Sequence, residues 1–384
     1  MQLLKEIFKL VIKFVLHIFY IFPIKKNRIF FDSFEGKQIS CNPYYICKAL
    51  QSNNFDLDII WNIRKTTVLV DDIKARFINY RSFSYILSLM TSKILITNND
   101  FPSYIPYRKN QIKINTWHGG GAYKRVGVEE NNHKKFLYRS LKSHSKNIDY
   151  FLSSSKKFTD IMSESNLIEN NKYLPFGMPR NDLFFDKDKC KEINVKVRKK
   201  INFLSDDFVI LFAPTYRGEA QNSYFNCKLD IPNLKKICEK RFKKNTKIIF
   251  RGHHTFNNKY SFSDFNLNLS SYPNMQELLC MADMLITDYS SSMWDFSFTN
   301  KPGFLFVPDL EKYQNERGFY TPIETWPFAF AKTNEELAEQ IMKWTPEFQA
   351  EKNKKHHELL GSFEDGHATE RICEVIKNEL INDF

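Results

Sequence analysis

Met284-Leu285-Ile286-Thr287-Asp288-Tyr289-Ser290-Ser291-Ser292 is a short apolar run that passes directly into a cluster of carboxylate and hydroxyl side chains. The apolar run predicts a buried β-strand, and the residues behind it, 293–298, predict a short helix. A strand followed by a polar turn and a helix is the repeating unit of parallel sheets covered by helices. Ligands of such sheets bind outside the carboxyl ends of the strands. The stretch therefore predicts an α/β fold and marks its own polar turn as a candidate binding site.

The same pattern recurs in two sets along the chain. The predicted buried strands are residues 28–34, 57–61, 93–97, 111–117, 150–152 and 172–174 in the first set, and 208–212, 247–250, 284–287 and 302–306 in the second. Helices are predicted at 42–50 and, as a pair, within 334–384, and the polar stretch 186–207 is predicted to connect the two sets. We expect two Rossmann-like domains that face a cleft, residues 27–190 and 191–384, after an N-terminal helix within residues 1–26.

The composition is that of a globular protein with a basic surface. Of the 384 residues, 42% are hydrophobic and 26% are charged, and the 56 Lys and Arg exceed the 44 Asp and Glu by 12. This excess suits an anionic partner, such as nucleic acid, acidic lipid headgroups or a phosphate-rich substrate, although it also fits a generic basic surface. The basic residues are not confined to one run and form no nucleic-acid-binding motif, so no nucleic-acid partner is expected.

The seven cysteines are scattered and form no Cys-x-x-Cys pair. This pattern indicates neither a zinc site nor a disulfide framework, and it fits a reducing, cytoplasmic compartment. No motif supports a catalytic cysteine. No cofactor is expected.

Residues 1–22 are rich in large apolar side chains. They lack the small-residue cleavage site of a signal peptide, and a spanning helix would bury several charges in hydrocarbon. Lys5, Lys9 and Lys13 recur every fourth residue, which places them on one stripe of a helix whose remaining surface is largely apolar. This spacing predicts an amphipathic helix that lies in the membrane interface and ends at Pro23. A helix packed on the protein's own core is the alternative.

The first strand-end motif is residues 116–125, Thr-Trp-His-Gly-Gly-Gly-Ala-Tyr-Lys-Arg. His118 can take up or release a proton near neutral pH. Gly119 and Gly120 let the backbone approach a ligand and expose amide groups to it, and Lys124 adds positive charge. A glycine turn with a structural histidine is the alternative.

Two further motifs follow strands of the second set. In Ala-Pro-Thr-Tyr-Arg, residues 213–217, Arg217 is a candidate phosphate-binding fork, or else a surface arginine. In Phe-Arg-Gly-His-His, residues 250–254, Arg251 and two histidines could handle phosphate or protons. Adjacent histidines point in different directions and no carboxylate cluster is nearby in sequence, so a metal is not expected.

The hydroxyl run at residues 290–292 could hold an anion, because hydroxyl and amide groups gather at a helix start. An ordinary serine N-cap would explain one of these serines but not all three. Glu277, in the helix predicted before this strand, could accept hydrogen bonds from ribose hydroxyls; alternatively, it is a solvated helix residue.

Together these blocks resemble the CDP-glycerol glycerophosphotransferase family of teichoic-acid and capsule enzymes. The resemblance rests on six blocks in the order of the family, Trp117-His118-Gly119, Gly177-Met178-Pro179-Arg180-Asn181-Asp182, Ala213-Pro214-Thr215-Tyr216-Arg217, Arg251-Gly252-His253, Thr287-Asp288-Tyr289-Ser290-Ser291 and Arg317-Gly318-Phe319-Tyr320. It implies a two-domain nucleotide-transferase fold of the GT-B type with an N-terminal region that associates with the cytoplasmic face of the cell membrane.

The resemblance also implies the chemistry. An acceptor hydroxyl would attack the β-phosphorus of CDP-glycerol or CDP-ribitol, and CMP would leave. His118 is the expected base, and His253 is the second expected catalytic histidine. The expected substrate-binding residues are Gly119, Gly120, Lys124, Arg180, Asn181, Asp182, Thr215, Arg217, Arg251, Glu277, Thr287, Asp288, Ser290, Ser291 and Arg317. The expected partners are this donor, a lipid-linked or polysaccharide acceptor, and an anionic membrane surface.

The sequence departs from the family pattern at two places. Gly120 and Gly121 stand where many of the polymerases have Thr-Pro, a change in the expected acceptor loop, and His254 stands where proline is common. The length of the chain favours a primase-like or capsule-type enzyme over a long-chain polymerase. The rival functions are a glycosyltransferase of the same fold that uses a nucleotide sugar, a nucleic-acid-binding protein and a non-catalytic membrane scaffold. The choice between glycerol and ribitol, the acceptor and the oligomeric state stay open.

Overall fold

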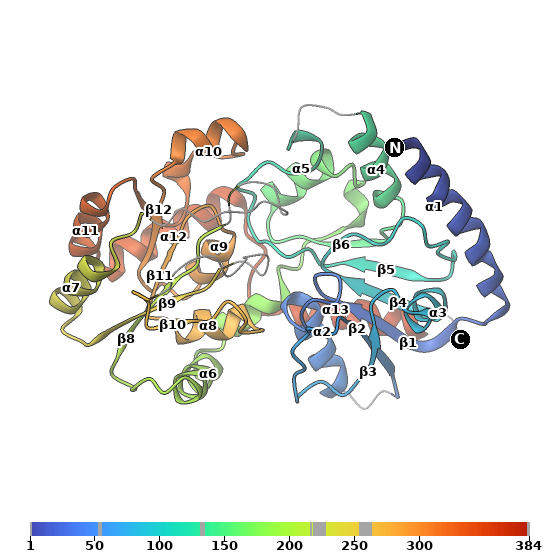
Figure 1. Cartoon of the computed structure of the whole chain (residues 1–384), viewed down its shortest axis with the longest axis horizontal. Helices are drawn as coiled ribbons and strands as arrows, with labels where there is room; N and C mark the ends of the chain where they lie inside the picture. The colour runs from blue at the N-terminus through green and yellow to red at the C-terminus, as the bar shows by residue number, and fades with distance from the viewer. Residues whose placement is uncertain are drawn as a thin grey trace. The chain divides into compact units, whose positions relative to one another are not determined.

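The computed structural model describes residues 2–52, 56–130, 135–215, 217, 228–252 and 263–381. The chain divides into two compact α/β units, each built on one parallel sheet (Figure 1). Unit 1 comprises Met1–His118, Val126–Asp182 and Phe363–Phe384, and unit 2 comprises Gly119–Arg125 and Leu183–Ser362. The predicted α/β class with two parallel sheets is confirmed.

The sheet of unit 1 has the strand order β3-β2-β1-β4-β5-β6-β7. Its strands are β1 (Lys25–Asp32), β2 (Asp58–Ile63), β3 (Arg76–Asn79), β4 (Ser92–Thr97), β5 (Ile112–Asn115), β6 (Tyr150–Leu152) and β7 (Tyr173–Leu174). This is the Rossmann order, in which the direction of winding reverses between β1 and β4. Ligands of such sheets bind at this reversal, the topological switch point, outside the carboxyl ends of the two strands.

Alternate side chains of β1 explain how the sheet is covered. Ile29 and Phe31 pack in one core cluster with residues of α2 (Cys41–Ser52) and α13 (Ala368–Ile381), and those two helices contact each other. Phe30 points to the other face and contacts Tyr85 of α3 (Phe83–Thr91) edge to face. Strands buried on both faces appear in a sequence as continuous apolar runs, which is why β1 and β4 could be recognised. The other helices of unit 1 are α4 (Lys135–Ser145) and α5 (Lys156–Ser165).

Unit 2 repeats the same topology. Its strands are β8 (Phe208–Phe212), β9 (Thr246–Phe250), β10 (Leu267–Asn268), β11 (Met284–Thr287), β12 (Gly303–Phe306) and β13 (Ala329–Ala331), in the order β10-β9-β8-β11-β12-β13. The switch point therefore lies between β8 and β11. Helices α7 (Ile231–Phe242) and α11 (Asn334–Lys343) pack in one core cluster with β8, β9, β11 and β12, while α8 (Met275–Met281) contacts β8 and α9 (Ser292–Ser297) contacts β11 and β12. The remaining helices are α6 (Lys187–Lys200), α10 (Leu310–Glu316) and α12 (Pro346–Leu360).

The observed division of the chain differs from the predicted boundaries. The stretch 186–207, expected to be a connection, is largely helix α6, which packs against α8 inside unit 2. Its N-terminus is set by Asp186, whose carboxylate accepts a hydrogen bond from the backbone N–H of Lys189. The C-terminal region holds three helices rather than two, and the last of them, α13, belongs to unit 1. The reason is Asp182, which accepts hydrogen bonds from the backbone N–H groups of Ala368 and Thr369 at the start of α13.

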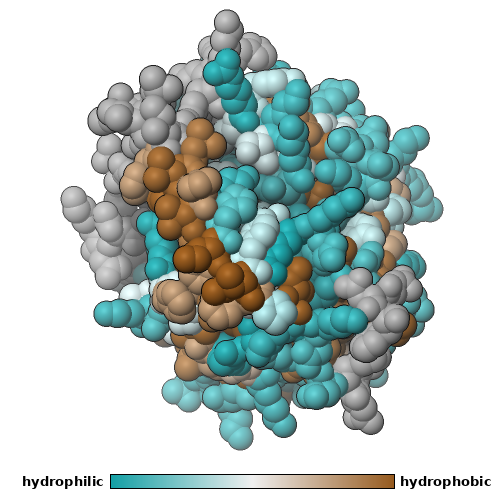
Figure 2. Space-filling view, turned by 90° about the vertical axis from the view of Figure 1, so that its right-hand side faces the viewer, coloured by the Kyte–Doolittle hydropathy of each residue, from teal (hydrophilic) through white to brown (hydrophobic). Residues whose placement is uncertain are grey.

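The N-terminal segment forms helix α1 (Gln2–Leu16) followed by the 3-10 helix η1 (His17–Ile21). Helix η1 is attached to unit 1, because Phe19 packs on Phe83, Arg108 donates a hydrogen bond to the carbonyl oxygen of Phe19, and Tyr20 donates one to that of Pro106. Large apolar side chains stay exposed on both helices, namely Phe8, Leu10, Val11, Phe14, Val15, Ile18 and Ile21. Figure 2 shows them as an apolar band across this side of the molecule. Among the described helices, none combines the length and the hydropathy of a membrane-spanning segment.

Candidate functional site

His118 lies at the switch point of unit 1. Its Nδ1 atom is 2.8 Å from the backbone carbonyl oxygen of Asn98, the residue that follows β4 directly. Its ring stacks on Trp117, with ring centroids 4.7 Å apart, and meets the ring of Phe34, which follows β1, edge to face at 5.6 Å. The imidazole itself is exposed. The fold thus presents a titratable side chain where a parallel sheet is expected to bind its ligand.

The contact with Asn98 fixes the tautomer of neutral His118. A carbonyl oxygen only accepts hydrogen bonds, so the proton of the neutral ring resides on Nδ1. The ring then carries its lone pair on Nε2, which can accept a proton from a hydroxyl group. This is the arrangement that a general base requires.

The backbone around His118 is strained and held by side-chain hydrogen bonds. Phe34 and Trp117 both have φ values of 51°, a left-handed conformation that residues with a Cβ adopt rarely. The amide of Phe34 donates to the side-chain oxygen of Asn98, and that of Trp117 donates to the side chain of Asn115, each over 2.8 Å. Strain of this kind gathers at active sites and ligand clamps, where the surrounding structure holds it in place. Asn98 therefore supports His118 through both its carbonyl group and its side chain.

Asp32 completes the switch point of unit 1. It is the last residue of β1, and its carboxylate accepts a hydrogen bond from the amide of Gly36 over 2.7 Å. Burial raises the pKa of this carboxyl to about 6. Asp32 thus fixes the turn that carries Phe34 to the ring of His118.

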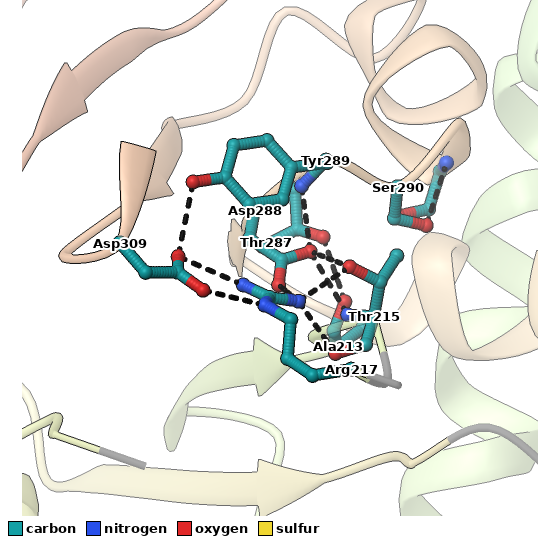
Figure 3. Close-up of polar contacts among 9 residues, drawn as sticks. Ala213, Thr215, Arg217, Thr287, Asp288, Tyr289, Ser290 and Asp309 are labelled. Atoms are coloured by element: carbon teal, nitrogen blue, oxygen red, sulfur yellow. Dashed lines mark hydrogen bonds and ion pairs between the residues drawn. The ribbon is translucent and has the colours of Figure 1, made fainter. Parts of the chain in front are cut away.

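A closed polar network occupies the switch point of unit 2 (Figure 3). The carboxylate of Asp288, after β11, accepts hydrogen bonds from the backbone amide and the hydroxyl of Thr215, after β8, both over 2.9 Å. Its other oxygen lies 2.9 Å from Nη1 of Arg217. Asp309, after β12, binds the other side of the same guanidinium through Nε at 2.6 Å and Nη2 at 3.1 Å. The phenol of Tyr289 donates to Asp309 over 3.0 Å.

This network gives Arg217 a structural role that the sequence did not predict. All three guanidinium nitrogens contact the two carboxylates, so the side chain fastens the loop after β8 to the loops after β11 and β12. Burial alone would lower the pKa of Arg217, but Asp288 and Asp309 raise it. In turn, Arg217 outweighs the effect of burial and holds the pKa of Asp309 below its usual value. Direct contact of Arg217, Thr215 or Asp288 with phosphate stays a prediction.

The hydroxyl-bearing residues after β11 and at its end make different hydrogen bonds. The Thr287 hydroxyl is buried and donates to the carbonyl oxygen of Ala213 over 2.6 Å, which joins the ends of β11 and β8. Ser290 Oγ accepts from the amide and the hydroxyl of Ser292 at the start of α9. Ser291 stands at the N-cap position, but its side chain makes no capping hydrogen bond. The N-cap explanation therefore does not apply to Ser291, and both Ser290 and Ser291 are half-buried.

Arg251 and Glu277 are linked through Tyr272. Arg251, one residue after β9, donates from Nη1 to the carbonyl oxygen of Tyr272 over 2.6 Å, and burial lowers the pKa of this guanidinium to about 10. The phenol of the same tyrosine donates to Glu277. His253 and His254 lie outside the described residues. Within the described ranges, no three His, Cys, Asp or Glu side chains are grouped as metal ligands would be.

The predicted block 180–182 is buried or nearly so within unit 1. Arg180 donates from Nη1 to the Cys41 sulfur over 3.2 Å, and the Asn181 amide donates to Glu364 over 3.0 Å. With Asp182 at the start of α13, these contacts attach the C-terminal segment to the unit. Substrate binding by these three residues stays a prediction.

The sequence analysis missed Asn98, Phe34 and Asp309. Each lies within three residues of the end of a strand, so the rule that identified the other candidates could also have selected them. Phe34 and the carbonyl group of Asn98 carried no signal of their own, because an apolar ring and a backbone oxygen do not form a recognisable motif.

Two Rossmann-type sheets, with a base-like histidine at one switch point and a hydroxyl-rich polar network at the other, define an α/β protein of the class that includes nucleotide-dependent transferases. The profile of the CDP-Glycerol:Poly(glycerophosphate) glycerophosphotransferase family matches residues 14–378. The chain belongs to this family and is a transferase.

Curated relatives agree with this assignment. The teichoic acid poly(glycerol phosphate) polymerase of Bacillus spizizenii is 31% identical over 370 residues, which cover 91% of this chain and 90% of the relative. The teichoic acid glycerol-phosphate transferase of Staphylococcus aureus is 28% identical over 368 residues, with 91% and 93% covered. The teichoic acid poly(glycerol phosphate) polymerase of Bacillus subtilis is also 31% identical, over 336 residues, but the aligned region covers only 44% of that relative.

Solved structures show the same fold. A variant of the wall teichoic acid polymerase TagF superposes with a TM-score of 0.83 and 25% identity over 96% of this chain and 94% of the other. A second TagF variant, soaked with CDPG, gives a TM-score of 0.82 and 26% identity over 94% and 90%.

Proposed function

We propose that the protein transfers glycerol phosphate, or another polyol phosphate such as ribitol phosphate, from a CDP-activated donor to a hydroxyl of a teichoic-acid or capsular acceptor, with release of CMP. The observation that carries this proposal is the exposed His118, whose Nδ1 is engaged by the carbonyl of Asn98 at the switch point of unit 1. Relatives named for glycerol-phosphate transfer and for ribitol-phosphate polymerisation support both donors. The two Rossmann-type units support assignment to the GT-B type of transferase.

In the proposed reaction, Nε2 of His118 removes the proton of the acceptor hydroxyl. The acceptor oxygen then forms a bond to the β-phosphorus, and the bond between that phosphorus and the oxygen bridging it to the α-phosphorus breaks, which releases CMP. We assign the donor to unit 2, where Ser290 and Ser291 would donate hydrogen bonds to the diphosphate and Arg251 would supply positive charge. His253 is proposed as a second group at the diphosphate.

The choice of donor tests this proposal. The protein is incubated separately with CDP-glycerol, CDP-ribitol and UDP-N-acetylglucosamine, each with a soluble glycerol-phosphate oligomer as acceptor, and nucleotide release is followed. We expect acceptor-dependent release of CMP from at least one of the two CDP-polyols. We expect no release of UDP from UDP-N-acetylglucosamine. Turnover of the nucleotide sugar alone would instead identify a glycosyltransferase.

The serine run provides a separate prediction. Replacing Ser290 and Ser291 together with alanine is expected to raise the KM for the CDP-polyol or to lower kcat/KM. Helix α9 has only six residues, so its dipole adds little to the binding of the diphosphate. The hydroxyl groups must therefore supply most of the interaction with the donor. Ser291 makes no capping hydrogen bond, so the variant loses only the contacts that Ser290 Oγ receives from Ser292. The cost in stability should therefore not exceed that of one lost cap, about 1 kcal/mol. A marked melting shift with unchanged donor kinetics would show that the serines only stabilise the helix.

We also propose that helix α1 and helix η1 bind the protein to an anionic membrane surface at the cytoplasmic face. Their exposed side chains include Phe14, 80% exposed, and Ile21, 74% exposed, and such large apolar side chains are normally buried. Lysines 9 and 13 lie on the same helix as this apolar surface, an arrangement typical of helices that lie in the headgroup region. Burial of Phe19 on Phe83 would transmit this anchoring to unit 1.

The membrane proposal predicts that Phe14→Asp weakens binding to phosphatidylglycerol vesicles, because it places a charge in the apolar surface. Phe348→Asp is the matched control, since Phe348 is also exposed, at 53%, but lies on α12 of unit 2. Removal of residues 2–16 should abolish binding while η1, which carries the buried Phe19, stays in place. Equal vesicle binding by Phe14→Asp and the unchanged protein in sedimentation assays would exclude this surface as the anchor.

A further inference from the structure

The glycine-rich loop that follows His118 belongs to a different unit from His118 itself. Residues Gly119–Arg125 group with unit 2, whereas His118 and the residues before it group with unit 1. The loop starts with three consecutive glycines, which leave a backbone with wide conformational freedom. Such a segment holds one conformation only when other contacts fix it, so the contacts of the loop decide how firmly the chain after His118 is held.

Backbone contacts with Gly318–Tyr320 fix the second half of the loop. The amide of Arg125 donates to the carbonyl oxygen of Gly318 over 3.2 Å, and the amide of Tyr320 donates to that of Tyr123 over 2.9 Å. Lys124 and Phe319 form an antiparallel bridge between these two hydrogen bonds. Two motifs nearly two hundred residues apart in the sequence are thus joined like neighbouring strands.

Side chains fix the loop more specifically. Gly120 lies against the indole of Trp294, so closely that a Cβ atom at this position would be 1.9 Å from Cδ1 of the indole. Trp294 belongs to α9, the helix that begins directly after Ser290 and Ser291. The first half of the loop therefore rests on the element to which we assign the donor.

Tyr123 anchors the second half of the loop through its side chain. Its ring is buried and packs edge to face on Trp326, and its hydroxyl lies 2.9 Å from Nε2 of His356 in α12. The Nδ1 atom of the same histidine lies 2.7 Å from the carbonyl oxygen of Thr325. Since a carbonyl oxygen only accepts, Nδ1 carries the proton and Nε2 must accept from the Tyr123 hydroxyl. Burial lowers the pKa of His356 to about 4, so the ring is neutral and the hydrogen bond keeps this direction.

We propose that Tyr123 and His356 are positioning residues of the transfer reaction: their hydrogen bond fixes the glycine loop and thereby holds His118 in its reactive place. The proposal rests on the proposed role of His118 as the base. Asn98 and Phe34 contact the ring of His118 within unit 1, and the loop that follows His118 in the chain groups with unit 2. Neither Tyr123 nor His356 is proposed to touch a substrate.

The test is the kinetics of Tyr123→Phe, which keeps the buried ring and removes only the hydroxyl. We expect kcat to fall about 10- to 100-fold, the range in which a misplacement of about 1 Å affects a reaction. The equilibrium affinity for CDP-glycerol should stay unchanged, because the donor residues of unit 2 are intact. In a His118→Ala background the same substitution should add no further loss, since a group that acts through His118 has nothing left to position.

Two variants separate positioning from general stability. Ser297→Ala removes the contact between a hydroxyl and Nε2 of His357, 2.8 Å long and one residue further along α12, and it should leave kcat unchanged. Tyr123→Phe combined with His356→Leu removes both partners of the Tyr123–His356 hydrogen bond, so that the buried Nε2 acceptor is no longer left unsatisfied, while the carbonyl oxygen of Thr325 loses the Nδ1 donor. We expect the combined variant to recover part of the thermal stability lost in Tyr123→Phe but not kcat.

Each contrary result has a distinct meaning. Normal kcat in Tyr123→Phe, when His118→Ala is impaired, would overturn the inference and leave the proposed function intact. Loss of CDP-glycerol affinity in step with kcat, loss of kcat in Ser297→Ala, or joint recovery of stability and kcat in the combined variant would also overturn it. Normal turnover of His118→Ala would refute the proposed base and, with it, the positioning role.

Discussion

Replacing His118 with alanine is expected to lower the rate of polyol-phosphate transfer about 10²–10⁴-fold, the usual contribution of a general base. The structure gives the reason: the neutral ring has its proton on Nδ1, toward Asn98, and its lone pair on Nε2. The KM for the CDP-polyol should change little, since we assign the donor to other residues. Steady-state CMP release with saturating donor and acceptor measures the effect.

A histidine elsewhere on unit 1 serves as control. His367 is exposed and contacts Glu370, three residues further on, so His367→Ala should retain normal turnover. If His118→Ala also kept near-normal turnover, another group would have to take up the acceptor proton. A rise in donor KM without a change in kcat would mean that His118 binds the donor instead of acting as the base.

Replacing Asp288 with alanine is expected to cost unit 2 about 3–5 kcal/mol of stability, the usual penalty for removing one partner of a buried ion pair. The side chain of Asp288 is 4% exposed and the side chain of its partner Arg217 is 13% exposed. Besides Arg217, the backbone amides of Thr215 and Tyr289 would lose their acceptor. The free energy of unfolding of unit 2 can be measured by hydrogen exchange of the β8 and β11 amides in denaturant. This method is needed because a chain of two units need not unfold in one step.

The control for Asp288→Ala is a substitution in an exposed ion pair of the same unit. Glu339 and Lys343 pair on the surface of α11, and Glu339→Ala should cost less than about 0.5 kcal/mol. If Asp288→Ala were equally mild and instead abolished donor binding, Asp288 would be a ligand-binding residue, as the sequence suggested, and the network would be incidental to stability.

Burial explains the strands that stand out most clearly in the sequence. β8 and β11 are buried at every position, so they appear as continuous apolar runs. The three missed strands lie toward the sheet edges: β3 has one buried residue among four, β10 has two residues and none of them buried, and β13 starts with two half-buried residues. An edge strand gains its conformation mainly from the backbone of its neighbour, and that contact leaves little trace in its own sequence.

The site residues were recognised by their place after strands, but not by their partners. Arg217 looked like an open phosphate fork because Asp309 lies 92 positions away and only the folded sheet brings the two together. The same limit applies to Tyr123 and His356, which are 233 positions apart. Local patterns therefore located both switch points, whereas the tautomer of His118, the pairing of Arg217 and the assignment of α13 to unit 1 depend on long-range contacts.

The most direct test of the proposed function is the mass of the acceptor after reaction. A soluble glycerol-phosphate oligomer is incubated with the protein and CDP-glycerol or CDP-ribitol, and mass spectrometry is combined with quantification of CMP. We expect the acceptor to gain whole polyol-phosphate units, with one CMP released per unit added, and His118→Ala to show neither. An acceptor of unchanged mass despite CMP release, or an acceptor of unchanged mass and no CMP release with both donors, would contradict the proposal.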